Sequence, residues 1–274
     1  KDLFEQHGVE VPTNKDEFLK ALQTLKDEGV APITVGARNG YAIGWIFGVM
    51  MESVMGTEQV VELLYGDGNW NDSKVVEVAE MMADWVEKGY ITKESVTQTQ
   101  PDSKFRFLSK QAAIEAEGTY LITDLADQKL EESVNMFMMP SFVDGDVAQP
   151  VGGIGLTWVV PTKAKDVEYA EKWMDFILSE DYSNIVLNLP DYNFIPASKA
   201  SESIEPVGDV LKSAMKSIED GSGYNPSVFM GVEAKEAYYQ NLQGLVGGLV
   251  TPQEAMDNIE KGAEKDRANG FSLK

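Results

Sequence analysis

Two carboxylates, a glycine and a tyrosine come together in the stretch AIEAEGTYLITDL, residues 113–125, where strand-like alternation gives way to a helical pattern. Glu115 and Glu117 are two residues apart and would share one face of a strand. Such a pair could serve a carboxylate-dependent glycosidase if one carboxyl group had a raised pKa and the scissile bond lay between them. The alternatives are that both are solvated acids, or that Glu117 accepts hydrogen bonds from a bound ligand.

A second polar cluster follows the apolar strand pattern of residues 30–36, in the sequence ARNGYAIGW. Side chains at the carboxyl ends of parallel strands share one rim of a sheet, so this cluster is expected at the same rim as Tyr120. Arg38 and Asn39 can form planar or bidentate hydrogen bonds with paired hydroxyl groups. Trp45 is followed by Ile46 and Phe47, so it could equally belong to the core.

Composition excludes several kinds of chemistry. The net charge of −22 disfavours a nucleic-acid partner, because phosphates would be repelled. The sequence has no cysteine and a single histidine, His7, which rules out thiolate nucleophiles, histidine-based triads and multi-histidine metal sites within the chain. We therefore expect neither a metal nor a cofactor.

Strand and helix patterns alternate along the chain, which predicts an α/β fold with a largely parallel core. Clusters of acidic residues, glycine and proline at 144–155 and 188–198 suggest breaks between structural bodies. The expected helices cover residues 13–29, 41–56, 72–90 and 166–189, with two more within 227–265. Residues 103–128 are expected to form a helix, a strand, a turn at Gly118 and a second helix, and the other expected strands lie at 30–36, at 134–142 and from 152.

Four segments occur in an order that resembles a known family: residues 14–41, 107–121, 152–179 and 242–261. The last contains LVTPQEAM, in which Thr251 and Glu254 form a helix-capping pattern. Together the segments resemble the extracellular solute-binding proteins of ABC transporters, in the sugar-binding branch that includes maltose-binding protein.

The resemblance implies a periplasmic-binding-protein-like (type II) fold of two α/β lobes. Residues 1–155 and 193–274 would form the second, C-terminal lobe, and residues 156–192 would belong to the first, N-terminal lobe. The first part of that N-terminal lobe would be lacking from this sequence. The implied function is that of a binding protein, not an enzyme: it captures a sugar or oligosaccharide between its lobes and delivers it to the transporter permease. It would act outside the cell, as a membrane-anchored lipoprotein or in the periplasm.

The same resemblance implies roles for individual residues. Tyr120, after Gly118, would stack on a sugar ring, because aromatic faces bury the C–H patches of pyranoses. Phe229 is a further stacking candidate, although it could instead pack at the start of the next helix. The complete set of candidate ligand-binding residues is Arg38, Asn39, Tyr41, Trp45, Glu117, Gly118, Tyr120, Gly152 and Gly153 at a lobe crossing, Tyr192 at the second crossing, and Phe229.

Residues 156–192 carry apolar side chains on one face, including Trp158, Trp173 and Phe176. In the resembled family a sheet formed mainly by upstream residues covers this face. An uncovered apolar face drives association. We therefore expect self-association, or an upstream fragment that covers residues 156–192.

Overall fold

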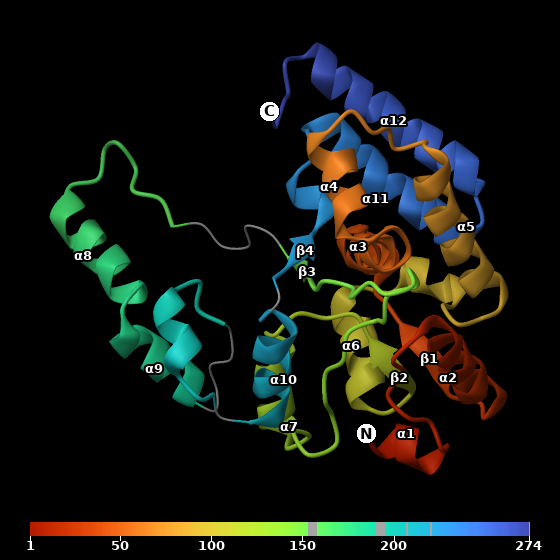
Figure 1. The fold of residues 1–274 in the computed structure, drawn as a ribbon, viewed down its shortest axis with the longest axis horizontal. Coiled ribbons are helices and arrows are strands. Elements are labelled where there is room, and N and C mark those ends of the chain that lie inside the picture. Colours follow the sequence, from red (N-terminus) through yellow and green to blue (C-terminus); the bar gives the residue numbers. More distant parts are fainter. Residues whose placement is uncertain (153–157, 190–194, 207, 220, 274) are drawn as a thin grey trace. The chain divides into compact units, whose positions relative to one another are not determined.

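A computed structural model describes residues 1–152, 158–189, 195–206, 208–219 and 221–273 (Figure 1). Contacts between Cα positions divide the chain into two compact units. Unit 1 consists of Lys1, Glu117–Phe137 and Ile154–Glu219, and unit 2 of Asp2–Ala116, Met138–Gly153 and Asp220–Lys274. The predicted lobes remain a prediction, because units defined by contacts need not coincide with lobes.

Helices of unit 2 begin at capping residues that the sequence supplies. The side chain of Asn14 accepts the N–H of Glu17 at 3.0 Å, and Thr251 forms a capping box with Glu254. The α-helices are α1 (Asp2–Gln6), α2 (Lys15–Asp27), α3 (Tyr41–Met55), α4 (Thr57–Tyr65), α5 (Ser73–Glu87), α6 (Gln100–Leu108), α11 (Val232–Gly247) and α12 (Pro252–Ala268). The 3-10 helices are η1 (Ala37–Asn39), η2 (Lys93–Thr97) and η4 (Pro226–Val228).

Two short parallel strand pairs lie within unit 2. Strand β1 (Ala31–Thr34) pairs with β2 (Ala112–Glu115), with Ile33 opposite Ile114. Strand β3 (Val151–Gly152) pairs with β4 (Gly223–Tyr224). The predicted parallel α/β class is therefore confirmed.

The core of unit 2 is built around α3 and α11. Tyr238 of α11 is fully buried, and its hydroxyl group donates to the carbonyl oxygen of Gly44 at 2.8 Å. Its ring meets those of Phe47 and Trp70 at 6.0 and 5.6 Å between centroids. Helix α12 lies along α11 and against α5 (Figure 1). This packing fixes the N-terminal end of α3, where Tyr41 and Trp45 remain partly accessible and the residues between them are buried.

Unit 1 is mostly helical in the residues that the structure describes. Its elements are α7 (Leu121–Gln128), α8 (Val167–Ile177), α9 (Glu180–Asn188), η3 (Lys199–Ser203) and α10 (Asp209–Ser217). Leu125, Leu187 and Leu211 are buried within it. No helix in the described part of either unit combines the length and apolarity needed to cross a membrane.

Two predictions about local structure were wrong, and a third holds only in part. Of the strand expected from 152, Gly152 lies in β3, residues 153–157 lie outside the described residues, and residues 158–160 form no strand. Residues 134–142 form no strand, and the N–H of Phe142 instead donates to the carbonyl oxygen of Ser53, near the end of α3, at 2.7 Å. The helix expected over 166–189 is two helices. Ser179 accepts the N–H of Tyr182 at 3.2 Å and so starts α9 anew.

Candidate functional site

The carboxyl end of β1 leads into a polar turn that delivers the chain to α3. Gly40 ends the short helix η1 with φ of +79°, a conformation that other residues rarely adopt, and a Cβ atom here would lie 2.6 Å from Cβ of Tyr239. The N–H of Arg38 donates to the carbonyl oxygen of Gln98 at 3.0 Å, and the Gln243 side chain donates to the carbonyl oxygen of Ala37 at 2.9 Å. The turn is therefore held by hydrogen bonds to its backbone groups, which leaves the side chains of Arg38 and Asn39 available to a ligand.

The side chains of Arg38 and Asn39 are exposed. Nearby, hydrogen bonds from the Thr99 hydroxyl and N–H groups lower the pKa of Asp102, and the positive charge of Arg38 lowers it further. Arg38 thus brings a guanidinium group to the rim of the β1–β2 pair beside a carboxylate that stays ionised. Such a rim offers both donors and acceptors to a hydroxyl-rich ligand.

Tyr41 and Trp45 lie one turn apart on α3, with ring centroids 5.1 Å apart and ring planes inclined at 56°. Both are half-buried, although most of their neighbours along the helix are buried. Trp45 is therefore not a full member of the core, the alternative that its apolar surroundings suggested. The pair presents an aromatic surface next to the polar turn.

Glu115 and Glu117 do not share a strand face as the spacing predicted, because β2 ends at Glu115. Ser103 of α6 donates to Oε1 of Glu115 at 2.7 Å, so this carboxylate bonds to a helix of its own unit. Glu117 falls in unit 1 and Glu115 in unit 2. The common strand face that the glycosidase alternative required is therefore lacking.

In unit 1, Gly118 and Tyr120 come directly before α7. A Cβ atom on Gly118 would lie only 2.5 Å from Cε1 of Tyr120, so the ring lies against the glycine and would have to shift for any larger residue. Tyr120 is 45% exposed. The glycine and the tyrosine therefore act as one feature, which sets an accessible ring at the start of a helix.

The two crossing positions differ in what the structure describes. Gly152 lies in β3 opposite Tyr224 of β4. Gly153 and Tyr192 lie outside the described residues.

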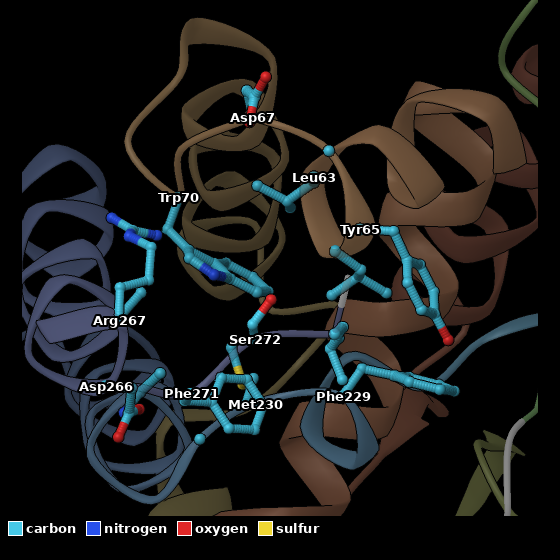
Figure 2. A pocket seen from close by; sticks show the side chains of 17 residues that line it. Leu63, Tyr65, Asp67, Trp70, Phe229, Met230, Asp266, Arg267, Phe271 and Ser272 are labelled. Carbon is cyan, nitrogen blue, oxygen red and sulfur yellow. The ribbon is translucent and has the colours of Figure 1, made fainter. Parts of the chain in front are cut away.

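Phe229 belongs to a triangle of half-buried aromatic rings. Its centroid lies 5.6 Å from that of Tyr65 and 5.3 Å from that of Tyr224, and Tyr65 and Tyr224 are 5.8 Å apart. Phe229 also lines a pocket between the end of α4 and the end of α12 (Figure 2). The position of Phe229 is therefore determined by ring packing. Gly152 pairs with Tyr224, which is one of the two rings that contact Phe229.

The apolar side chains of this pocket include those of Leu63, Trp70 and Met230, and its charged side chains include those of Asp67 and Arg267 (Figure 2). The volume is about 210 Å³. Ligand pockets usually have roughly 300–1,000 Å³, so this one is too small for an oligosaccharide. Within the described residues no three histidine, cysteine or acidic side chains are grouped to hold a metal ion.

Comparison with known proteins identifies the family of this chain. Residues 1–213 match the family model described as bacterial extracellular solute-binding protein. The chain belongs to this family. An ABC transporter extracellular-binding protein of Pyrococcus horikoshii, described as uncharacterised, is 25% identical over 260 residues, which are 93% of this chain and 56% of that protein. The chain thus spans little more than half the length of this curated relative.

Solved structures show the same fold as this solute-binding chain. A chitin oligosaccharide binding protein superposes with a TM-score of 0.84 at 20% identity, over 97% of this chain and 68% of its own. A sugar transporter protein from Bacillus licheniformis in complex with stachyose superposes with a TM-score of 0.75 at 17% identity, over 96% of this chain and 69% of its own. The predicted type II periplasmic-binding-protein fold is confirmed.

The sequence did not lead us to one further residue, Glu52, which lies on α3, the helix that carries Tyr41 and Trp45. It is the one charged residue among the fifteen of this helix and is 1% exposed. A lone carboxylate in an apolar helix was the signal that could have identified it, because buried charges are rare unless they are bonded.

Proposed function

We propose that this chain is part of the substrate-binding component of an ABC importer and that its ligand is a sugar or oligosaccharide. The observation that carries the proposal is the half-buried pair Tyr41 and Trp45 beside the exposed Arg38 and Asn39. Aromatic faces bury the C–H patches of sugar rings, and planar polar groups bind their hydroxyl groups. The family, and the sugar ligands named for proteins of the same fold, support this choice.

The proposed mechanism is capture followed by delivery. The ligand binds between two lobes, the lobes close on it, and the closed protein presents it to the permease in the membrane. Tyr120 and Phe229 are proposed as further stacking residues, Glu117 as a hydrogen-bond acceptor, and Gly118, Gly152, Gly153 and Tyr192 as positions close to the ligand or the lobe crossings.

We propose binding without covalent chemistry. A carboxylate glycosidase needs two carboxyl groups aimed at one bond, and Glu115 is instead bonded to Ser103. Incubation of the full-length protein with chromogenic glycosides tests this. No release of chromophore is expected, and release that is lost in Glu115→Gln would establish an enzyme.

The family is extracellular, so the protein is proposed to act outside the cytoplasm. A lipid anchor and a periplasmic location are both compatible with that proposal. Mass spectrometry of the protein purified from its native membrane and soluble fractions would separate the two. A lipid-modified N-terminal peptide is expected for the anchored form.

The described residues of 156–192 bear an accessible aromatic row in unit 1. Trp158, Trp173 and Phe176 follow one another at centroid distances of 5.8 and 5.8 Å, and Trp158 is 58% exposed. No side chain of the fully described helix α8 is buried. We propose that this face is covered in the assembled protein, by residues outside these 274 or by a second copy.

Ligand binding tests the proposed function. Stachyose or a chitin oligosaccharide at a hundred times its Kd should stabilise the full-length native protein by about 2.7 kcal/mol, seen as a rise in Tm. Tyr41→Ala should reduce the rise, while Phe105→Ala, which removes an exposed aromatic ring of α6, should leave it unchanged. Stabilisation by amino acids or phosphate esters, with none by any sugar of a broad panel, would show that the ligand class is wrong.

A further inference from the structure

Four residues of α3 share one narrow stripe of the helix. Tyr41, Trp45, Gly48 and Glu52 are separated by four, three and four positions, which places them within about 60° around the helix axis. The first two are the aromatic residues of the candidate site. The last two contact the segments that carry the chain between the units.

Gly48 brings the backbone of α3 close to β3 and η4. A Cβ atom on Gly48 would lie 3.0 Å from Cδ of Pro226 and 3.5 Å from Cγ1 of Val151. The chain passes from unit 2 to unit 1 after residue 153 and returns at 220, so β3 and β4 are the unit 2 ends of two crossings. Gly48 therefore lies against the segments next to these two crossings.

Glu52 completes the hydrogen bonding of β4. The N–H groups of Gly223 and Asn225 donate to carbonyl oxygens of Pro150 and Gly152 at 2.9 and 2.6 Å. The N–H of Tyr224 lies between them in sequence and points to the other side of the strand, where Oε1 of Glu52 accepts it at 2.9 Å.

The contact is close and enclosed. A Cβ atom on Gly223 would lie 2.3 Å from Oε1 of Glu52, so the strand backbone rests directly on the carboxyl group. Oε2 accepts the hydroxyl group of Thr57 at 2.7 Å, at the start of α4. One carboxyl group thus joins α3, α4 and β4.

We propose that Glu52 is a positioning residue for the ligand-contacting end of α3, and that it couples Trp45 to strand β4 at the chain crossings. The importance of Trp45 for a ligand rests on the proposed function, whereas the coupling itself does not. Coupling is reciprocal. If the charge on Glu52 changes the affinity for a ligand that contacts Trp45, then binding of that ligand changes the proton affinity of Glu52 by the same factor.

The charge on Glu52 can be followed because its environment is unusual. Burial raises the pKa of Glu52 above its ordinary value of 4.5, the hydrogen bonds from Thr57 and Tyr224 oppose that rise, and the negative charge of Asp146 adds to it. Asp146 is the charged group that acts on Glu52 from the loop before β3, and Thr57 and Tyr224 face it from α4 and β4. Titration of Glu52 is therefore expected above the range of exposed glutamates.

An NMR pH titration without ligand tests the coupling. In the full-length protein, the backbone N–H of Tyr224 and the indole N–H of Trp45 should shift with one shared midpoint above 4.5. Glu52→Gln is nearly isosteric and keeps an oxygen to accept the Tyr224 N–H, so it should preserve the spectrum while removing that titration from both signals. Asp146→Asn should lower the shared midpoint.

Two control variants separate positioning from general stability. Glu52→Ala should increase hydrogen exchange of the Tyr224 N–H about tenfold or more, and Glu52→Gln should restore protection. Thr57→Val removes the other bond to Glu52 and should leave the Tyr224 N–H protected. With a bound sugar, Glu52→Ala should also weaken affinity about fivefold or more, which is within the usual range of coupling.

The outcomes are distinguishable. If Trp45 does not follow the titration that Tyr224 shows, or if Glu52→Gln leaves that titration in place, the coupling is refuted. If Glu52→Ala does not fold, the titrations of the wild type and of Glu52→Gln still test the coupling. If no sugar binds while both signals titrate together, the proposed function fails and the coupling stands.

Discussion

Replacing Asp266 by alanine should destabilise the protein more than the loss of any exposed helix cap. Asp266 belongs to α12, yet its two carboxylate oxygens accept the N–H groups of Glu233 and Ala234 at 3.1 and 2.8 Å. Those N–H groups lie in the first turn of α11, where no helical partner exists. Gly231, before the helix, has no side chain of its own to cap it.

The magnitude follows from burial. Asp266 is 6% exposed, so alanine would leave two N–H donors without an acceptor in a place that water reaches poorly. Hydrogen bonds to charged groups contribute about 1.5–3 kcal/mol each. With part of the loss recovered by relaxation, the free energy of unfolding should fall by about 3 kcal/mol, roughly a hundredfold in the unfolding equilibrium. Asp266→Asn keeps one acceptor oxygen and should lose about half of that.

Urea unfolding followed by tryptophan fluorescence measures the effect, with the slope m compared to exclude changes in the unfolded state. Thr251→Ala is the matched control, because it removes the cap of α12 at an exposed position and should cost about 1 kcal/mol. A loss for Asp266→Ala no larger than for Thr251→Ala would refute the argument that a buried carboxylate with two accepted N–H groups stabilises the protein more than an exposed cap does.

Three further predictions concern the site, the surface and pH. In the full-length protein, Tyr120→Ala should weaken sugar binding by about 1–3 kcal/mol through lost stacking, as measured by calorimetry; equal affinity would remove Tyr120 from the site. Trp173 is 44% exposed, so Trp173→Gln should reduce self-association of the 274-residue chain in sedimentation velocity, and a wild-type chain that stays monomeric would contradict the prediction. The N–H and hydroxyl groups of Thr251 hold the pKa of Glu254 below 4.5. The stability advantage of wild type over Glu254→Gln should therefore be present above pH 4.5 and disappear as the pH falls through the folded-state pKa, and an advantage independent of pH would exclude this cause.

The sequence predicted those elements whose signals are local. The sequence offered Thr13 or Asn14 as the cap of α2 and Thr251 as the cap of α12, because a capping bond involves residues only three apart; Asn14 and Thr251 make these bonds. The parallel pairing followed from alternating strands and helices. The residues of the polar turn before α3 were predicted together because they are neighbours in the chain.

Predictions failed where partners lie far apart in the sequence. Residues 134–142 have the composition of a strand, but Ser53 of α3 takes the N–H of Phe142, and no local pattern announces that bond. Similarly, Glu115 and Glu117 have strand spacing, yet β2 ends between them and Ser103 binds Glu115. Long-range hydrogen bonds decide both cases, and a single sequence does not contain them.

The stripe on α3 shows why a helix can hide its function from a pattern of hydrophobicity. Most of the helix is apolar, which predicts burial on all sides, and the buried faces carry residues such as Ile43, Phe47 and Met50. Function is expected where that uniformity is broken, by the half-buried rings of Tyr41 and Trp45 and, two turns later, by a buried carboxylate. A buried charge costs free energy unless each of its oxygens is bonded, and here both are, one of them by the backbone of a crossing strand. Packing alone would be served at least as well by a leucine. The presence of glutamate at this position is therefore best explained by the hydrogen bond that it accepts from strand β4, and not by packing in the core.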